Sequence, residues 1–340
     1  MKNGNHDGSS GDRKLHNPVE DRLTAPELLD LTKVRSIDGL VRAMAQTAFT
    51  GRQLGEVVDV LEAMARDEEC FVVMTLAGPM TVAKHGLIIT ELIDRGIVNA
   101  IVSTGALMVN DQAQDQIQDQ AYAALHSEGN LGEFEAVMSV LDDWDHADVM
   151  CSYKFNHALG AHLAKHAKEQ RSILKSAYEK GVPVFVPAFT DSDLGLDVAL
   201  NNRMRESTGR HKIRFDPFED LEHFAATLLR QTRLGIFTIG GGVPHSWSQQ
   251  FGPFIELRRR RMNENIPPKR YHYGVRICPE PVPDEAIPWA RFVPPAEGGK
   301  FGEVFVDATV GLPIIVAAVL ERLGKDKSAS KKKEKATARK

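Results

Sequence analysis

Short apolar runs alternate with longer amphipathic stretches from about residue 70 to near the end of the chain. The runs at 71–76, 98–102 and 234–239 are too short for buried helices and rich in β-forming residues, so they predict buried strands. Between such runs apolar residues recur at a helical period, as at 82–95 and 218–230. Because short joints connect strand, helix and strand, the pattern favours right-handed βαβ units and a parallel sheet.

The rest of the chain extends this pattern. Residues 28–44 and 57–64 have helical spacing and predict a helical N-terminal part. Further expected strands are 181–186, 273–277 and 304–306, and further expected helices are 134–144, 158–179 and 312–323. The sequence therefore predicts an α/β protein with a Rossmann-like, mostly parallel sheet and helices on both faces.

The domain boundaries follow from composition. Residues 1–24 are polar and have no period, which predicts a disordered tail. Residues 25–323 form one large domain, and residues 324–340 are a lysine-rich tail that we expect to be disordered and solvated. With 42% hydrophobic and 26% charged residues, the domain has the composition of an ordinary soluble protein.

Charge and cysteine content narrow the class of protein. The formal net charge of -4 argues against a general nucleic-acid binder. The three cysteines, Cys70, Cys151 and Cys278, are widely spaced, which fits a reducing cytosol better than a disulfide framework. No apolar run is long enough for a membrane span or a secretory signal. We therefore expect a cytoplasmic protein that binds neither nucleic acid nor membrane.

The ends of the predicted strands carry the candidate ligand site. In doubly wound sheets, ligands bind at the carboxyl ends of the strands. Hydroxyls and bare amides there suit phosphate, and acids suit ribose hydroxyls. These ends hold Ala77-Gly78, Ser103-Thr104-Gly105, Thr190-Asp191, Gly240-Gly241-Gly242 and Asp307-Ala308. Without a G-x-G-x-x-G fingerprint, NAD is one option among nucleotides and sugars, and each stretch alone could be an ordinary turn.

Other residues suggest a cationic ligand. Carboxylates could hold a polycation and an indole could pack against it, although turn and helix-cap roles are about equally expected. These residues are Asp191, Asp193, Asp197, Asp284, Glu285 and Trp289. His162 and His166 have an i, i+4 spacing that could hold zinc, but a solvated helix face is the better interpretation, and we expect no metal. The arginine run 258–261 is interpreted as a solvated or subunit-contact face.

The order and spacing of these motifs resemble the deoxyhypusine synthase family. The resemblance rests on 239–244, on 283–286 with Trp289, and on 306–308, which are similar to the C-terminal half of that family. Residues 184–195, 98–105 and 49–64 are similar to its central and N-terminal parts. The similarity spans roughly residues 35 to 323. The stretches 103–107 and 293–299 resemble its bacterial deoxyhypusine synthase-like branch, and homospermidine synthase is a relative.

This resemblance implies an activity and an assembly. The family moves an aminoalkyl group from a polyamine such as spermidine to an amine acceptor, with NAD as the transient hydride acceptor. It is a homotetramer with sites at subunit interfaces. The implied cofactor-binding residues here are Ser103, Thr104, Gly105, Asp191, Gly241, Gly242, Asp307 and Ala308. The implied substrate-binding residues are Asp197, Glu285 and Trp289, and the implied catalytic residues are Arg291, Glu285 and His245.

The chain departs from the family at several of these positions. The family's nucleophilic lysine is Arg291 here, and arginine stays protonated and does not readily form an imine. The family's substrate histidine falls on Ser246, with His245 one place earlier, and a second substrate acid falls near Leu196, beside Asp197. The family's Gly-Ser-Asp-Ser-Gly loop is replaced by the shorter stretch 277–282.

These departures keep two other functions open. One is an NAD-linked amine oxidoreductase or lyase, and the other is a catalytically silent binding or regulatory subunit. Lys300 is a further candidate for the missing lysine. The sequence does not specify the donor and acceptor amines, whether a protein lysine is the acceptor, or whether Arg291 abolishes or redirects catalysis.

Overall fold

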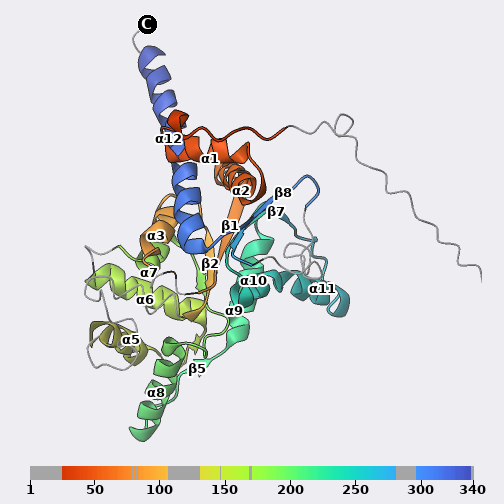
Figure 1. Ribbon diagram of the computed structural model, residues 1–340. Coiled ribbons are helices and arrows are strands. Elements are labelled where there is room, and N and C mark those ends of the chain that lie inside the picture. Colours follow the sequence, from red (N-terminus) through yellow and green to blue (C-terminus); the bar gives the residue numbers. More distant parts are fainter. Residues whose placement is uncertain are drawn as a thin grey trace, which may run out of the picture.

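A computed structural model shows a six-stranded sheet in which every neighbouring pair is parallel (Figure 1). The strand order is β4-β2-β1-β6-β7-β8. The bounds are β1 Cys70–Leu76, β2 Ala100–Ser103, β4 Val184–Phe185, β6 Arg233–Ile239, β7 Tyr271–Cys278 and β8 Lys300–Phe305. The structure describes residues 25–78, 80, 83–105, 131–145, 147–167, 171–280 and 296–337. The predicted α/β class with a mostly parallel sheet is confirmed.

The strand order places a topological switch point between β1 and β6. From β1 the chain builds the sheet outward through β2 and β4, and it then returns to the other side of β1 to add β6, β7 and β8. In open α/β sheets, ligands bind in the crevice outside the carboxyl ends of the strands at such a point. The fold itself therefore points to the segments that follow β1 and β6.

Helices cover both faces of the sheet. One face packs on α2 Phe49–Arg66, α3 Gly86–Asp94 and α12 Ala308–Thr337, and the other on α9 Pro217–Leu229, α10 Gly242–Gln249 and α11 Phe251–Arg261. Neighbouring β1 residues belong to different hydrophobic clusters: Val72 and Met74 to the first, and Val73 to the second. Burial on both faces explains why the strands are continuous apolar runs.

Two of the remaining described elements come first in the chain, η1 Leu31–Lys33 and α1 Ile37–Ala45, and α1 packs on α2 and α12. The others lie mainly beside the β4 edge of the sheet. They are α5 Leu131–Asp143, α6 Ser152–His166, α7 Ile173–Lys180, α8 Asp193–Ser207 and a small parallel pair, β3 Val149–Met150 with β5 Arg214–Phe215. In Figure 1, α3, α6 and α7 lie on one side of the sheet, and α10 and α11 on the other.

Three expectations about the elements differ from the structure. The single helix expected at 158–179 is two helices, because Ser172 caps α7 by accepting the amide of Lys175. The helix α8 was not predicted. The closing helix, expected to end at Leu323, continues in the backbone to Thr337, so most of the tail expected to be disordered is helical. The expected tail at 1–24 lies outside the described residues.

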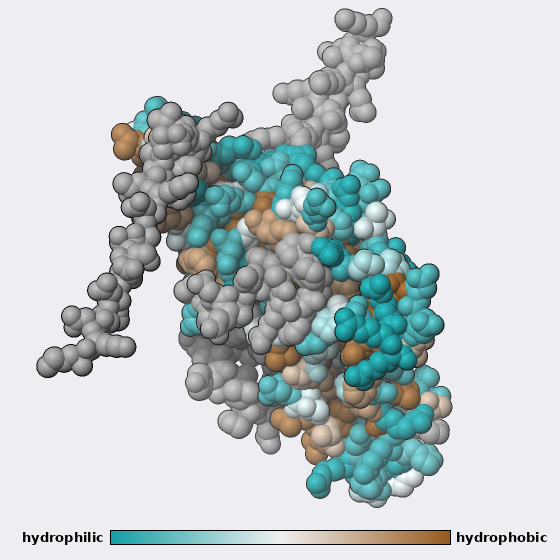
Figure 2. Space-filling view, turned by 90° about the vertical axis from the view of Figure 1, so that its right-hand side faces the viewer, coloured by the Kyte–Doolittle hydropathy of each residue, from teal (hydrophilic) through white to brown (hydrophobic). Residues whose placement is uncertain are grey.

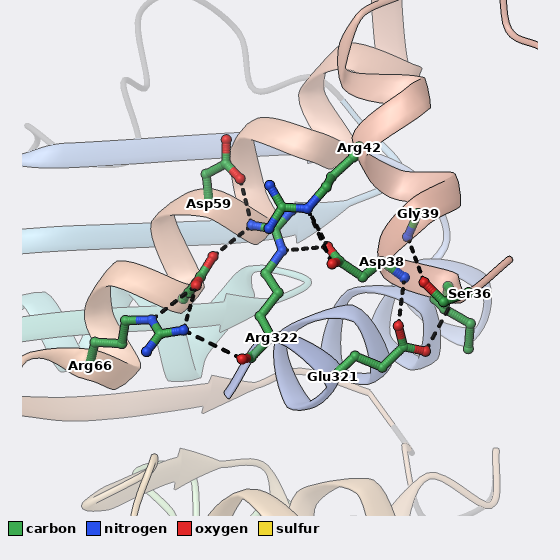
Figure 3. A network of polar contacts seen from close by, with 10 residues as sticks. Ser36, Asp38, Gly39, Arg42, Asp59, Arg66, Glu321 and Arg322 are labelled. Carbon is green, nitrogen blue, oxygen red and sulfur yellow. Dashed lines mark hydrogen bonds and ion pairs between the residues drawn. The ribbon is translucent and has the colours of Figure 1, made fainter. Parts of the chain in front are cut away.

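A buried cluster of charges joins the first and last helices. Arg322 of α12 is 4% exposed and contacts Asp38 of α1 and Asp59 and Glu62 of α2, at 2.6, 2.6 and 2.8 Å (Figure 3). Arg66 also pairs with Glu62. Burial opposes the charge on Arg322, but its three carboxylate partners outweigh this effect and raise the pKa of the guanidinium. We call these residues, together with Arg42, the Arg322 cluster.

The side of the molecule that carries α11 has a mainly polar surface (Figure 2). In that view apolar residues lie in separate small areas of the coloured surface. The arginine run of α11 is ion-paired: Arg258 contacts Glu264 at 2.6 Å, and Arg259 and Arg260 contact Glu256. Among the described residues, no helix is both long enough and apolar enough to span a bilayer.

Candidate functional site

The predicted cofactor segments meet at one edge of the sheet. We call this the carboxyl edge: residues 77–78 after β1, 104–105 after β2, 240–242 after β6 and 306–308 after β8. Parallel register brings the segments together, because Leu76 pairs with Ser103 on one side and with Ile239 on the other. Four stretches far apart in the sequence therefore lie along one edge of the sheet, on both sides of the switch point.

The glycine turn at 240–242 follows β6 directly. Gly240 and Gly242 have φ of 76° and 65°, the left-handed region that glycine adopts without strain. A Cβ on Gly240 would lie 3.2 Å from the Cβ of Ala77, so the turn also packs closely on the end of β1. Gly242 has no neighbouring atom within 4 Å of a Cβ position. The turn thus presents bare backbone to open space where α10 begins.

Gly105 brings the segment after β4 to the same edge. A Cβ on Gly105 would lie 1.9 Å from the Cβ of Ser192, so no larger residue fits without movement. Ser192 caps α8 by accepting the amide of Gly195, and it follows the exposed Asp191. Asp191 therefore lies next to the segment that holds Thr104. The Ser103 hydroxyl donates instead to the carbonyl of Leu76, at 3.3 Å.

Two polar atoms near the carboxyl edge are buried without a hydrogen-bond partner among the described residues. They are Oγ1 of Thr104 and Nδ1 of His85, which precedes α3. Asp307 lies close enough to His85 for an electrostatic effect. Hydrogen bonds from the hydroxyl and amide of Thr309 lower the pKa of Asp307, with a small contribution from His85. Buried polar atoms are normally satisfied, so this edge has capacity for a polar ligand.

The candidate substrate residues are only partly within the described chain. Asp197 lies half-buried on α8. Its pKa is raised, first by burial and then by repulsion from Asp193. Glu285, Trp289 and Arg291 lie outside the described residues, so the structure places neither the expected amine-binding pair nor the residue at the lysine position.

His245 lies in the first turns of α10, half-buried beside the glycine turn. Its Nδ1 is 3.0 Å from Oγ1 of Thr238, and its Nε2 is 2.8 Å from Nε2 of Gln249. Both ring nitrogens therefore contact groups of the protein itself. His245 thus lies close to the glycine turn, while its role in the site stays a prediction.

Sequence reasoning missed Arg276. It is 5% exposed near the carboxyl end of β7, pairs with Glu303 of β8, and its Nε lies 3.5 Å from the carbonyl oxygen of Gly240. Its Nη2 lies 3.7 Å from a Cβ position on Gly241. Arg276 therefore supports the glycine turn from the β7 side. A charged residue inside the apolar run of β7 was the signal that could have identified it.

Two further candidates lie away from the carboxyl edge. Lys300 begins β8, while Asp307 follows its other end, about 20 Å away at 3.3 Å per residue. This placement argues against Lys300 as a replacement for the family lysine within the same chain. The rings of His162 and His166 are 4.4 Å apart on α6. Across the described parts of the chain, no group of three or more potential ligands could hold a metal ion.

The fold and the site together define an open, doubly wound α/β protein with a candidate ligand site at the switch point of its sheet. The chain belongs to the deoxyhypusine synthase family: the model of that family, described as "Deoxyhypusine synthase", matches residues 39–129 and 115–319. These ranges include every segment of the carboxyl edge.

Individual relatives agree with this assignment. The chain is 28% identical over 333 residues to the "Probable deoxyhypusine synthase 2" of Methanosarcina acetivorans, covering 90% of this chain and 92% of the relative. It is 27% identical to the "Deoxyhypusine synthase-like protein" of Chlorobaculum parvum, covering 81% and 84%. The crystal structure of a "putative deoxyhypusine synthase" from Entamoeba histolytica has a TM-score of 0.60 at 14% identity, covering 86% of this chain and 95% of that one, and supports the fold.

Proposed function

We propose that this protein is an NAD-dependent transferase that moves an aminoalkyl group from a polyamine such as spermidine to an amine acceptor. Membership of the deoxyhypusine synthase family supports the reaction class. The observation that carries the proposal is the buried Thr104 hydroxyl, which has no partner among the described residues although it lies at the switch point of the sheet. A bound ligand would satisfy it.

The carboxyl edge fits a dinucleotide. Asp307 uses Oδ1 to cap α12 through Thr309, so Oδ2 can accept a ribose hydroxyl. Gly241 and Gly242 allow a phosphate to approach the backbone at the start of α10. Asp191, Gly105, Ser103 and Ala308 complete the proposed cofactor-binding set. When bound, NAD would accept a hydride from the carbon next to the donor nitrogen and return it later in the cycle.

Acidic and aromatic side chains would hold the amine. Asp197 is half-buried, so its carboxylate would interact strongly with an ammonium group. We assign Glu285 the same role from the motif, and we assign Trp289 packing against the methylene chain. His245 lies near the glycine turn, at the start of α10.

The substitution of Arg291 for the family lysine suggests direct transfer. Arginine stays protonated, so it would orient the substrate and not attack it. The acceptor amine would then add to the oxidised donor carbon, the bond from that carbon to the departing diamine would break, and the returned hydride would restore the saturated amine. The overall reaction would be redox-neutral and would consume no NAD.

We further propose a cytoplasmic homotetramer. The family implies this assembly, and the structure offers one supporting feature: exposed apolar residues stand in the first turns of four helices that begin near the carboxyl edge. They are Leu87, Leu196, Val243 and Val310. Light scattering of the purified protein tests the assembly directly, and a monomeric mass would contradict it.

The test of function is an incubation of purified protein with NAD and spermidine, putrescine or agmatine, with mass spectrometry of all products. We expect a longer amine, with NAD unchanged at the end. Accumulation of NADH with a free aldehyde or imine would instead identify an oxidoreductase. Bound NAD without any product would identify a silent subunit. Arg291→Lys is the informative variant, because a gain of activity would show that the arginine has weakened the ancestral chemistry.

A further inference from the structure

Two buried threonines face each other in the centre of the sheet, where apolar residues surround them. Thr75 of β1 and Thr238 of β6 are register partners, exposed by 1% and 0%. The Thr75 hydroxyl donates to Oγ1 of Thr238 at 2.9 Å. A buried hydroxyl destabilises the folded protein unless hydrogen bonds compensate for the lost water. A second partner for this pair is therefore expected, and it comes from the helix that covers this face.

That partner is His245 of α10. Its Nδ1 lies 3.0 Å from Oγ1 of Thr238, and its Nε2 lies 2.8 Å from the side-chain amide of Gln249, which is 2% exposed. The result is a continuous chain of side chains, Thr75–Thr238–His245–Gln249, which we call the threonine–histidine chain. Whichever ring nitrogen carries the proton in the neutral imidazole, both nitrogens contact the protein itself.

The threonine–histidine chain encloses the glycine turn. Thr238 lies two residues before Gly240, and His245 lies three residues after Gly242. The contact between them therefore closes a loop around the turn and fixes the start of α10 relative to β6. From the other side, the Gly240 amide donates to the carbonyl of Ile277 at 2.7 Å. The glycines allow the turn several backbone conformations, and these contacts hold it in one of them.

We propose that His245 is a positioning residue of the carboxyl edge and does not transfer protons to the substrate. It acts through Thr238 and Thr75, which hold the backbone of Gly241 and Gly242 ready for an anionic ligand. The identity of that ligand as NAD rests on the proposed function, whereas the contacts and their effect on the turn do not. The resemblance to the family implies a catalytic role for His245, whereas this proposal assigns it a positioning role.

The first test compares His245→Ala, His245→Asn and Thr238→Val by calorimetric titration with NAD and by steady-state turnover. Asn retains a polar atom near the Nδ1 position but cannot act as a base. We expect Ala and Val to weaken NAD binding about five- to tenfold, the effect of about one hydrogen bond. We expect Asn to restore binding and turnover to within about threefold. The double variant His245→Ala with Thr238→Val should bind no more weakly than either single variant.

Loss of turnover in His245→Asn with unchanged NAD affinity, or additive losses in the double variant, would overturn the proposal. The matched control is Thr90→Val, which removes a buried hydroxyl bonded to the carbonyl of Gly86 within α3. It should leave NAD affinity within twofold of wild type.

A ligand-free measurement separates this inference from the proposed function. Amide hydrogen exchange at Gly240 reports the closure of the turn, because that amide is bonded to Ile277. We expect exchange at least tenfold faster in His245→Ala and in Thr238→Val, and unchanged exchange in Thr90→Val. Unchanged exchange at Gly240 in His245→Ala would overturn the inference, even if NAD binds. Faster exchange at Gly240 in His245→Ala, together with a wild-type protein that binds no NAD, would leave the inference intact and refute the proposed cofactor.

Discussion

The middle of α12 and the residue just before its first turn contrast in how completely their polar groups are satisfied. In the middle of the helix, Arg322 is buried and contacts three carboxylates. Just before the helix, about 20 Å away along its axis, Asp307 is exposed and lies near Nδ1 of His85, which is buried without a partner among the described residues. Arg322 joins α1, α2 and α12, whereas Asp307 forms part of the carboxyl edge.

This difference distinguishes a structural cluster from a candidate ligand site. In the Arg322 cluster the protein itself supplies the partners of the buried guanidinium, which is typical of a structural role. At the carboxyl edge, Thr104 and His85 bury polar atoms for which the described chain supplies no partner. Such groups carry a cost in the free protein and are expected where a ligand completes them. We therefore expect changes in the Arg322 cluster to affect stability, and changes at the carboxyl edge to affect ligand binding.

Arg322→Ala should have the largest effect and should act on stability alone. Removing one member of a buried ion-pair network takes the buried cation away from the buried Asp38, and we expect the free energy of unfolding to fall by about 3–5 kcal/mol. Urea denaturation measures this change. The control is Arg42→Ala, which removes an exposed partner of the same Asp38 and should cost less than about 1 kcal/mol. Equal effects of the two variants would show that the cluster is not a buried network.

Gly105→Ala should act on both stability and ligand binding. The new methyl group would meet the Cβ of Ser192 at 1.9 Å, which forces the segments after β2 and β4 apart. Overpacking of this kind costs about 1–3 kcal/mol. If Asp191 and Thr104 bind one ligand, NAD affinity measured by calorimetry should also fall, by about tenfold or more. Unchanged NAD affinity in a folded variant would show that the segments after β2 and β4 do not bind the same ligand.

Gly242→Ala tests the glycine turn without a steric clash. Gly242 and Gly181 both have positive φ, and neither has an atom within 4 Å of a Cβ position. Alanine at either position should therefore cost a similar amount, about 1–2 kcal/mol of backbone strain. Only the change at 242 should weaken NAD binding, because Gly181 caps α7 away from the carboxyl edge. Equal NAD affinities of the two variants would contradict a ligand role for the turn.

The smallest predicted effect concerns the pH dependence of amine binding. The pKa of Asp197 is raised, so this carboxyl loses its charge at a higher pH than an ordinary aspartate as the pH falls. If Asp197 holds an ammonium group, amine affinity should fall as the pH drops through that raised pKa. Asp193→Asn removes the repulsion and lowers the pKa of Asp197, so amine affinity should then fall only at a lower pH. Glu206→Gln, a control on the same helix, should leave the pH at which amine affinity falls unchanged.

Sequence reasoning recovered the sheet because its strands are buried on both faces. The resulting apolar runs, such as 234–239, differ clearly from the helical stretches between them. The rule that ligands bind at the carboxyl ends of parallel strands predicted the glycine turn and the segments after β2 and β8 as parts of the candidate site. The helix α8 was missed because apolar residues lie on its buried and exposed sides alike: Val198 is buried, whereas Leu196 and Leu200 are exposed. An amphipathic period is therefore weak there.

The contacts that determine the role of each residue in the site join residues far apart in the sequence. The pattern of apolar and polar positions therefore did not predict them. His85 and Asp307 come together only through the packing of α3 and α12 beside the sheet. Likewise, the pairing of Thr75 with Thr238 depends on the register of β1 with β6, which a run of apolar residues does not specify. His245 was therefore identified by position near the glycine turn, but its partners were not.

The most direct test of the central claim is calorimetric titration of NAD into the wild-type protein and into Thr104→Val. Valine removes a buried hydroxyl that has no partner among the described residues, so the free protein should be at least as stable as wild type. We predict measurable NAD binding to wild type and binding about fivefold weaker to the variant, the effect of about 1 kcal/mol. Equal affinity, or no binding to wild type, would contradict the account of the carboxyl edge as the cofactor site.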